Sequence, residues 1–105
     1  MWYKLDENNK PVQANDVHDY LKWSDGNPLA KPVAQEHIDT IYVSTVFLGL
    51  DHGWNGETPI LWETMIFGGE HDQYQERYTS YEDALEGHKV ALNLVNNSLC
   101  GTQEK

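Results

Sequence analysis

The sequence predicts a single α+β domain over residues 1–105: a small antiparallel sheet, a C-terminal helix packed on one of its faces, and a short N-terminal helix. A length of 105 residues suits one hydrophobic core. Two runs in the middle of the chain, residues 41–48 and 60–67, are rich in the β-branched and aromatic residues typical of strands. Apolar residues then recur at helical spacing over residues 81–95, which indicates an amphipathic helix.

The N-terminal third predicts a strand, a helix and a loop, in that order. Trp2–Leu5 forms a short strand that ends in a polar turn cluster. Asn15 is placed to cap a short helix that begins at Asp16, whose carboxylate suits the positive end of the helix dipole. Residues 25–37 contain one glycine and two prolines and are expected to form a loop.

The middle of the chain predicts an antiparallel meander of three to four strands. Runs 41–48 and 60–67 are apolar on both alternations, which suits central strands. The segment Asp51–Pro59, with two glycines, connects them as a loop. A third run, Tyr74–Tyr78, follows a turn over residues 68–72, and such short connections favour antiparallel pairing.

The predicted C-terminal helix begins at a capping box in which Thr79 and Glu82 close the first turn. Gly87 weakens this helix by about 1 kcal/mol relative to alanine, unless helix and sheet approach closely there. The polar residues 97–105 are expected to form a flexible tail. The stripe expected to pack on the sheet consists of Tyr81, Ala84, Leu85, His88, Ala91, Leu92 and Val95.

The chain is strongly acidic, and this disfavours several kinds of partner. It has 17 Asp and Glu against 7 Lys and Arg, a formal net charge of −10. No stripe of basic residues is present to release counterions from phosphates, so direct nucleic-acid binding and docking to anionic membranes are not expected. An acidic surface suits a basic partner, so the expected partner is a protein. Homo-oligomerisation is left open.

The compartment is expected to be the cytoplasm. The N-terminal residues lack the basic and apolar regions of a secretory signal. The longest stretch free of charge and proline, Thr40–Leu50, is far shorter than the ~20 residues of a membrane helix. The one cysteine, Cys100, cannot form an internal disulfide, which favours a reducing environment.

Glu63 is the first candidate for chemistry, because it lies in an apolar strand where a lone carboxylate is costly to bury. One interpretation is a general base or a metal ligand. The other follows from register: a turn that pairs Phe67 with Gln73 places Glu63 opposite Arg77, as an internal ion pair. Glu63 and Arg77 are therefore binding candidates in one interpretation and structural partners in the other.

His88 lies on the apolar stripe of the last helix, facing the predicted sheet. It fits a hydrogen-bonded core histidine, or a site shared with Glu63 and with Asp51 and His52 at the end of a strand. The five histidines show no metal-binding spacing, so no metal and no cofactor are predicted. Trp54, in a loop with two glycines, is a candidate contact anchor or a lid on its own hairpin.

Several strings carry a resemblance to a known family: Tyr42–His52, Trp62–Gly69, Arg77–Thr79, and Ala84 followed by Gly87 and His88. Together with Trp2–Leu5, these strings resemble a family of small uncharacterised proteins that are common in phages and in bacterial genomes carrying prophages. The resemblance covers about residues 41–95. It implies an accessory protein made in the host bacterial cytoplasm, and it carries no activity with it.

Two classes of function are expected from these observations. The leading one is a non-enzymatic accessory protein that binds a host or phage macromolecule, with interference in host defence as one form. The alternative is a small enzyme, or a binder of a nucleotide-sized ligand, with or without a divalent metal, built around Asp51, His52, Glu63 and His88. Convergence of these four side chains would favour the alternative, and dispersal, with Glu63 paired to Arg77, would favour the first class.

Overall fold

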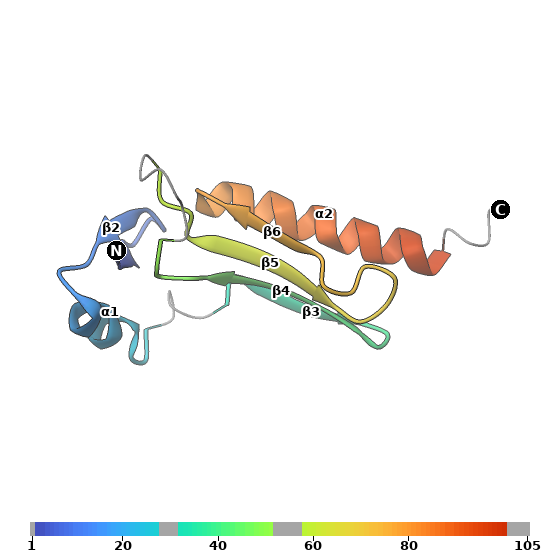
Figure 1. Cartoon of the computed structure of the whole chain (residues 1–105), viewed down its shortest axis with the longest axis horizontal. Helices are drawn as coiled ribbons and strands as arrows, with labels where there is room; N and C mark the ends of the chain where they lie inside the picture. Colours follow the sequence, from blue (N-terminus) through green and yellow to red (C-terminus); the bar gives the residue numbers. More distant parts are fainter. Residues whose placement is uncertain (1, 28–31, 52–57, 101–105) are drawn as a thin grey trace.

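The structure, a computed structural model, describes residues 2–27, 32–51 and 58–100 and confirms the α+β class. Helix α2 lies along one face of a four-stranded sheet, and the N-terminal hairpin and α1 lie together beyond one end of that sheet (Figure 1). In chain order the elements are β1 (Tyr3–Leu5), β2 (Pro11–Gln13), α1 (Val17–Ser24), β3 (Ala34–Ile38), β4 (Ile41–Phe47), β5 (Trp62–Phe67), β6 (Gln75–Tyr78) and α2 (Tyr81–Cys100).

The four-stranded sheet is an antiparallel meander with the strand order β3-β4-β5-β6. Its central pair, β4 and β5, lies in the two apolar runs, and β6 lies within the third predicted run, as expected. Strand β3 corrects the prediction of a loop over residues 25–37. Three of its five residues are polar and exposed, so no apolar pattern marks it. Backbone pairing along β4 holds it in the sheet as an edge strand.

The N-terminal unit also differs from the prediction in two places. Strand β1 pairs with β2, a strand of three exposed residues that the sequence does not predict and that begins at Pro11, the end of the predicted turn. The cap of α1 is Asp16 rather than Asn15, because the Asp16 carboxylate accepts a hydrogen bond from the Asp19 N–H at 2.9 Å. The Asn15 N–H donates to the Asp19 carboxylate at 2.9 Å, so the first turn is closed from both sides.

A row of aromatic rings joins this N-terminal unit to the sheet. Successive ring centroids lie 4.8 Å apart from Trp2 to Tyr20 and 5.9 Å apart from Tyr20 to Trp23. The row continues at 6.0 Å to Phe47 and at 5.4 Å from Phe47 to Trp62, all within the favourable range for aromatic pairs. The hairpin, α1 and one end of the sheet therefore share one hydrophobic core.

Helix α2 packs on the sheet through four buried residues at helical spacing: Ala84, His88, Ala91 and Val95. The predicted stripe is confirmed at these positions, whereas Leu85 is exposed. Alanine at two of the four positions lets the helix lie close to the strands, where Val95 and Ala91 pack with apolar residues of β4 and β5.

Both ends of α2 differ from the prediction. The cap is Ser80 rather than Thr79, since the Ser80 hydroxyl accepts a hydrogen bond from the Asp83 N–H at 3.0 Å. The helix then continues to Cys100, so residues 97–100 of the predicted flexible tail are helical. Extending a formed helix gains a hydrogen bond for each residue added, and polar residues do not prevent this. Residues 101–105 lie outside the described residues.

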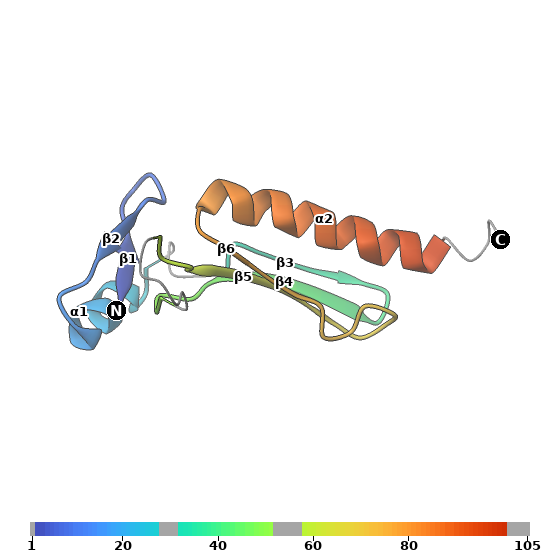
Figure 2. The ribbon, with the colours of Figure 1, turned by 45° about the horizontal axis from the view of Figure 1, so that its top comes forward.

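The register of the strands decides which side chains meet α2. Side chains alternate between the faces of a sheet, so every second residue of β4 and β5 points to the helix. On β5 the intervening residues are Glu63, Met65 and Phe67, and they point to the opposite face, which no described helix or strand covers (Figure 2). The cross-strand pairs on the α2 side are Val43–Ile66, Thr45–Thr64 and Phe47–Trp62.

Candidate functional site

Glu63 and Arg77 pair as the register predicts. They lie directly opposite each other on β5 and β6, and the Arg77 Nε donates to the Glu63 carboxylate at 3.0 Å. The Gln75 side-chain amide donates to the same carboxylate oxygen. The pair is not internal, however: it lies on the uncovered face, where the Arg77 side chain is 41 % exposed and that of Glu63 13 %. Met65 and Phe67 share this face, but no helix of the described residues covers it, which is why the expected burial is wrong.

His88 is a hydrogen-bonded core histidine. Its Nδ1 lies 2.7 Å from the Thr45 hydroxyl, and that hydroxyl lies 2.5 Å from the hydroxyl of Thr64. On the other side of the ring, Nε2 lies 2.7 Å from the Glu36 carboxylate. A neutral ring that donates from Nε2 to Glu36 accepts from Thr45 at Nδ1, and Thr45 then accepts from Thr64. This polar network crosses from β3 through α2 to β4 and β5.

The order carboxylate, imidazole, hydroxyl in this network has the roles of a nucleophilic triad, but its location does not suit chemistry. Thr45 and Thr64 are fully buried under α2, and His88 is nearly so. A substrate carbonyl therefore has no path to the Thr45 oxygen. The network satisfies polar groups in the core and sets the position of α2 on the sheet. Sequence reasoning missed Glu36, Thr45 and Thr64, although the β4–β5 register alone places the two threonines opposite each other.

Of the four residues of the alternative site, Glu63 and His88 do not meet. Glu63 points to the uncovered face of the sheet, whereas His88 of α2 packs against the other face. The sheet therefore separates the two side chains. The Asp51 carboxylate accepts a hydrogen bond from the Ile60 N–H at 2.9 Å, within the connection between β4 and β5. His52 and Trp54 lie outside the described residues. Within the described part of the chain, no three His, Cys, Asp or Glu side chains group as metal ligands would.

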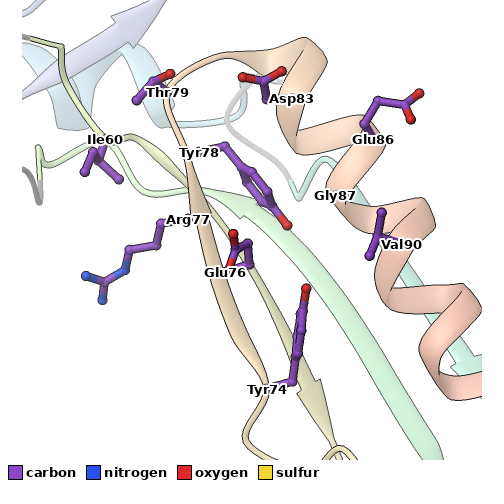
Figure 3. A pocket seen from close by; sticks show the side chains of 10 residues that line it. All are labelled: Ile60, Tyr74, Glu76, Arg77, Tyr78, Thr79, Asp83, Glu86, Gly87 and Val90. Carbon is purple, nitrogen blue, oxygen red and sulfur yellow. The ribbon is translucent and has the colours of Figure 1, made fainter. Parts of the chain in front are cut away.

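A pocket that the sequence did not indicate lies between the edge strand β6 and helix α2 (Figure 3). Its volume is about 400 Å³, within the range of small-ligand sites. We call it the β6–α2 pocket. Its lining residues are Ile60, Tyr74, Glu76, Arg77, Tyr78, Thr79, Asp83, Glu86, Gly87 and Val90.

One wall of the β6–α2 pocket is built by two alternate residues of β6 and by Tyr74, which directly precedes this strand. Tyr74, Glu76 and Tyr78 project from the same side of the strand toward α2, with Glu76 between the two rings (Figure 3). Burial raises the pKa of Tyr74 above its ordinary value, and the Glu76 carboxylate adds to this. Burial also raises the pKa of Tyr78, an effect that the Thr64 hydroxyl opposes. Both phenols are therefore neutral at physiological pH.

The opposite wall is the first half of α2, and at Gly87 the Tyr78 ring takes the space that a side chain would need. A Cβ at this position would lie 2.0 Å from the Tyr78 hydroxyl oxygen, far inside contact distance. Helix α2 therefore approaches β6 closely here, which is the condition under which glycine is favoured over alanine at this position. The buried Tyr78 hydroxyl forms no hydrogen bond of good geometry among the described residues.

The charge of the β6–α2 pocket is negative. Glu76, Asp83 and Glu86 line it, and among the described residues the carboxylates of Glu76 and Asp83 form no ion pair. Glu86 lies 3.5 Å from Lys89, but both side chains are largely exposed, so water screens that contact. The Arg77 guanidinium extends away from the pocket, toward Glu63 on the uncovered face (Figure 3).

Comparisons with models of protein families, with curated proteins and with solved structures give no match. Of the helices in the described residues, neither combines the length and the apolar character needed to cross a membrane.

Proposed function

We propose that this chain is a small acidic accessory protein of the phage or prophage kind, which binds a basic segment of a host or phage protein in the β6–α2 pocket. The observation that carries the proposal is the pocket itself: a concave, aromatic-walled site lined by three carboxylates. Such a site is complementary to a cationic protein segment, and the formal net charge of −10 attracts one over a longer range.

The position of the pocket at a sheet edge also supports a peptide ligand. Strand β6 has β5 on one side and no strand on the other among the described residues. An extended segment can lie along such an edge and direct alternate side chains into a neighbouring groove. The dispersal of Glu63 and His88 to opposite faces supports binding rather than catalysis.

The setting comes from the resemblance of the β4, β5 and β6–α2 segments to small phage and prophage proteins. A phage accessory protein that binds one host protein tightly is suited to block it, so we propose inhibition of a host defence protein as the form of this function. Inhibition by occupation of a basic surface needs no cofactor and no metal.

The test is binding of a defined basic peptide by fluorescence anisotropy. The probe is a labelled nine-residue peptide of alternating arginine and valine, and its acidic counterpart has glutamate in place of arginine. We expect the basic peptide to bind with an affinity that falls as salt rises, and the acidic one not to bind. Failure of the basic peptide to bind at low salt contradicts the proposal.

Matched variants separate the pocket from net charge alone. The double variant Glu76→Gln, Asp83→Asn removes two pocket carboxylates, and Glu7→Gln, Glu70→Gln removes two exposed carboxylates that do not line the pocket. Both change the net charge equally. We expect at least about fivefold weaker binding for the pocket variant and a much smaller loss for the control. Equal losses of affinity in the two variants would show that the peptide responds to the overall negative charge of the protein and not to this pocket.

A further inference from the structure

We infer that the β6–α2 pocket contains a cation subsite, in which Tyr74 and Tyr78 flank the cationic end of an arginine or lysine side chain and Glu76 pairs with it. This inference rests on the proposed function, because it names the group of the basic segment that the pocket recognises. It reaches further in one respect: the subsite is expected to take the side-chain cation on its own, without the rest of a partner.

Strand β6 and Tyr74 directly before it place the three groups where a cation needs them, because the Tyr74 carbonyl still accepts a hydrogen bond from the Ile66 N–H of β5 at 3.1 Å. Residues i, i+2 and i+4 of a strand lie on one face and are separated by roughly 6–7 Å at each step. A cation held over Glu76 is therefore about one step from either ring, close to the ~6 Å range of cation–π attraction. Figure 3 shows both rings on the α2 side of the strand, with Glu76 between them along the chain.

The charges around the pocket favour a cation and disfavour an anion. Glu76 and Asp83 form no ion pair among the described residues, so each carboxylate is available to a ligand. Arg77, the one basic residue of the lining, is engaged by Glu63 on the other face of the sheet. The two phenols add no charge in the neutral form. A guanidinium can also stack on the flat face of a tyrosine and donate hydrogen bonds to a carboxylate at the same time.

The size of the pocket fits a side chain with its stem. A volume of about 400 Å³ exceeds that of a guanidinium or ammonium group alone. Half-exposed Val90 and partly buried Ile60 lie on the lining and offer apolar surface to the methylene groups. Gly87 leaves the helix wall without a side chain at the level of the Tyr78 hydroxyl, which makes room for this ring at the pocket.

The experiment is an NMR titration of the ¹⁵N-labelled protein with single blocked amino acids. The probes are the N-acetyl, N-methylamide derivatives of arginine and lysine, and citrulline in the same form is the neutral isostere of arginine. We expect saturable shifts for the cations, at residues 74–79 and 83–90, and none for citrulline. Shifts for arginine but not lysine identify the guanidinium as the ligand, and the reverse identifies the ammonium. Equal shifts with citrulline overturn the inference.

Variants decide whether the named side chains form the subsite. Glu76→Gln and Tyr74→Leu are each expected to weaken the cation about fivefold or more, while Tyr74→Phe retains most of the affinity because it keeps the ring. Glu82→Gln, an exposed helix position outside the lining, is the matched control for charge. Unchanged ¹⁵N spectra away from the pocket verify that the variants are folded.

The outcome is separable from that of the proposed function. If the basic peptide binds in the pocket but Glu76→Gln and Tyr74→Leu leave both the peptide and the blocked amino acids unaffected, the cation subsite is wrong and the proposed function stands. If neither peptide nor blocked cation binds, both are wrong.

Discussion

At the scale of single residues, Thr45 is the centre of the buried polar network. Its hydroxyl contacts both His88 and Thr64, so its loss leaves two buried polar groups without a partner. We expect Thr45→Val to destabilise the fold by about 1–3 kcal/mol, the usual penalty for such groups. Urea denaturation midpoints measure this cost.

A second variant checks the explanation. In Thr45→Val, Thr64→Val the second hydroxyl is gone as well, so only the His88 ring nitrogen is left unpartnered. We expect the double variant to be no less stable than the single one. Losses that simply add would show that the two threonines contribute independently and that no network connects them.

Gly87 is the residue where helix propensity and packing oppose each other. Alanine gains about 1 kcal/mol in helix propensity, but its Cβ would lie 2.0 Å from the Tyr78 hydroxyl oxygen and 2.2 Å from the adjacent ring carbon. We therefore expect Gly87→Ala to lower stability, with an overpacking cost of about 1–3 kcal/mol.

Thermal denaturation of two further variants completes this test. Tyr78→Leu in the Gly87→Ala background removes the clashing atoms and should return part of the loss. Asn93→Ala, at an exposed position of the same helix, should be neutral or slightly stabilising. A Gly87→Ala variant as stable as the original chain would mean that α2 can move away from β6 at little cost.

At the scale of elements, the pair Glu63–Arg77 connects β5 and β6 on the uncovered face. The burial of this ion pair decides how much it stabilises the fold, since breaking a fully buried pair would cost about 3–5 kcal/mol of stability. Arg77 is 41 % exposed, so solvent screens the interaction. We expect Arg77→Met to destabilise by no more than about 1 kcal/mol.

A double-mutant cycle measures the coupling of this pair directly. With Glu63→Gln and Arg77→Met as the single changes, we expect a coupling energy of roughly 0.2–1 kcal/mol that shrinks as salt is added. A coupling of several kcal/mol, insensitive to salt, would indicate that another part of the protein or a partner covers this face in solution.

At the scale of the whole molecule, net charge governs which polymers approach. With a formal net charge of −10, the protein repels phosphate, and the side chains of the β6–α2 pocket reinforce this. We expect no binding of duplex DNA up to about 100 µM at physiological salt in an anisotropy titration. Saturable binding in the micromolar range would contradict this expectation and would require a basic surface that the sequence does not contain.

Much of the fold could be predicted from local patterns. Apolar runs marked β4 and β5, helical spacing marked the buried positions of α2, and turn length gave the register that pairs Glu63 with Arg77. Strands β2 and β3 could not be predicted in this way. Their residues are largely exposed, so hydrogen bonds to a neighbouring strand define them and no periodic burial does.

The candidate sites depend on longer distances in the sequence. Glu36 and His88 are 52 residues apart in the sequence, and Thr45 and His88 are 43 apart. No short sequence motif can therefore indicate that these side chains are in contact. The β6–α2 pocket likewise needs the helix to lie against an edge strand, close enough for Gly87 to meet Tyr78. Only one part of it, the alternation of tyrosine and glutamate over residues 74–78, is visible in the sequence.

By itself, the sequence determined the class of fold, the order of the central strands, the side of α2 that packs, and the acidic character of the chain. Tertiary structure alone decided which face of the sheet α2 covers. That choice buried the His88 network, left Glu63 and Arg77 partly in water, and formed the β6–α2 pocket. The physical reason is that the alternation of side chains along a strand assigns residues to the two faces of the sheet. Only the packing of a helix that is distant in the sequence decides which of these faces is removed from water.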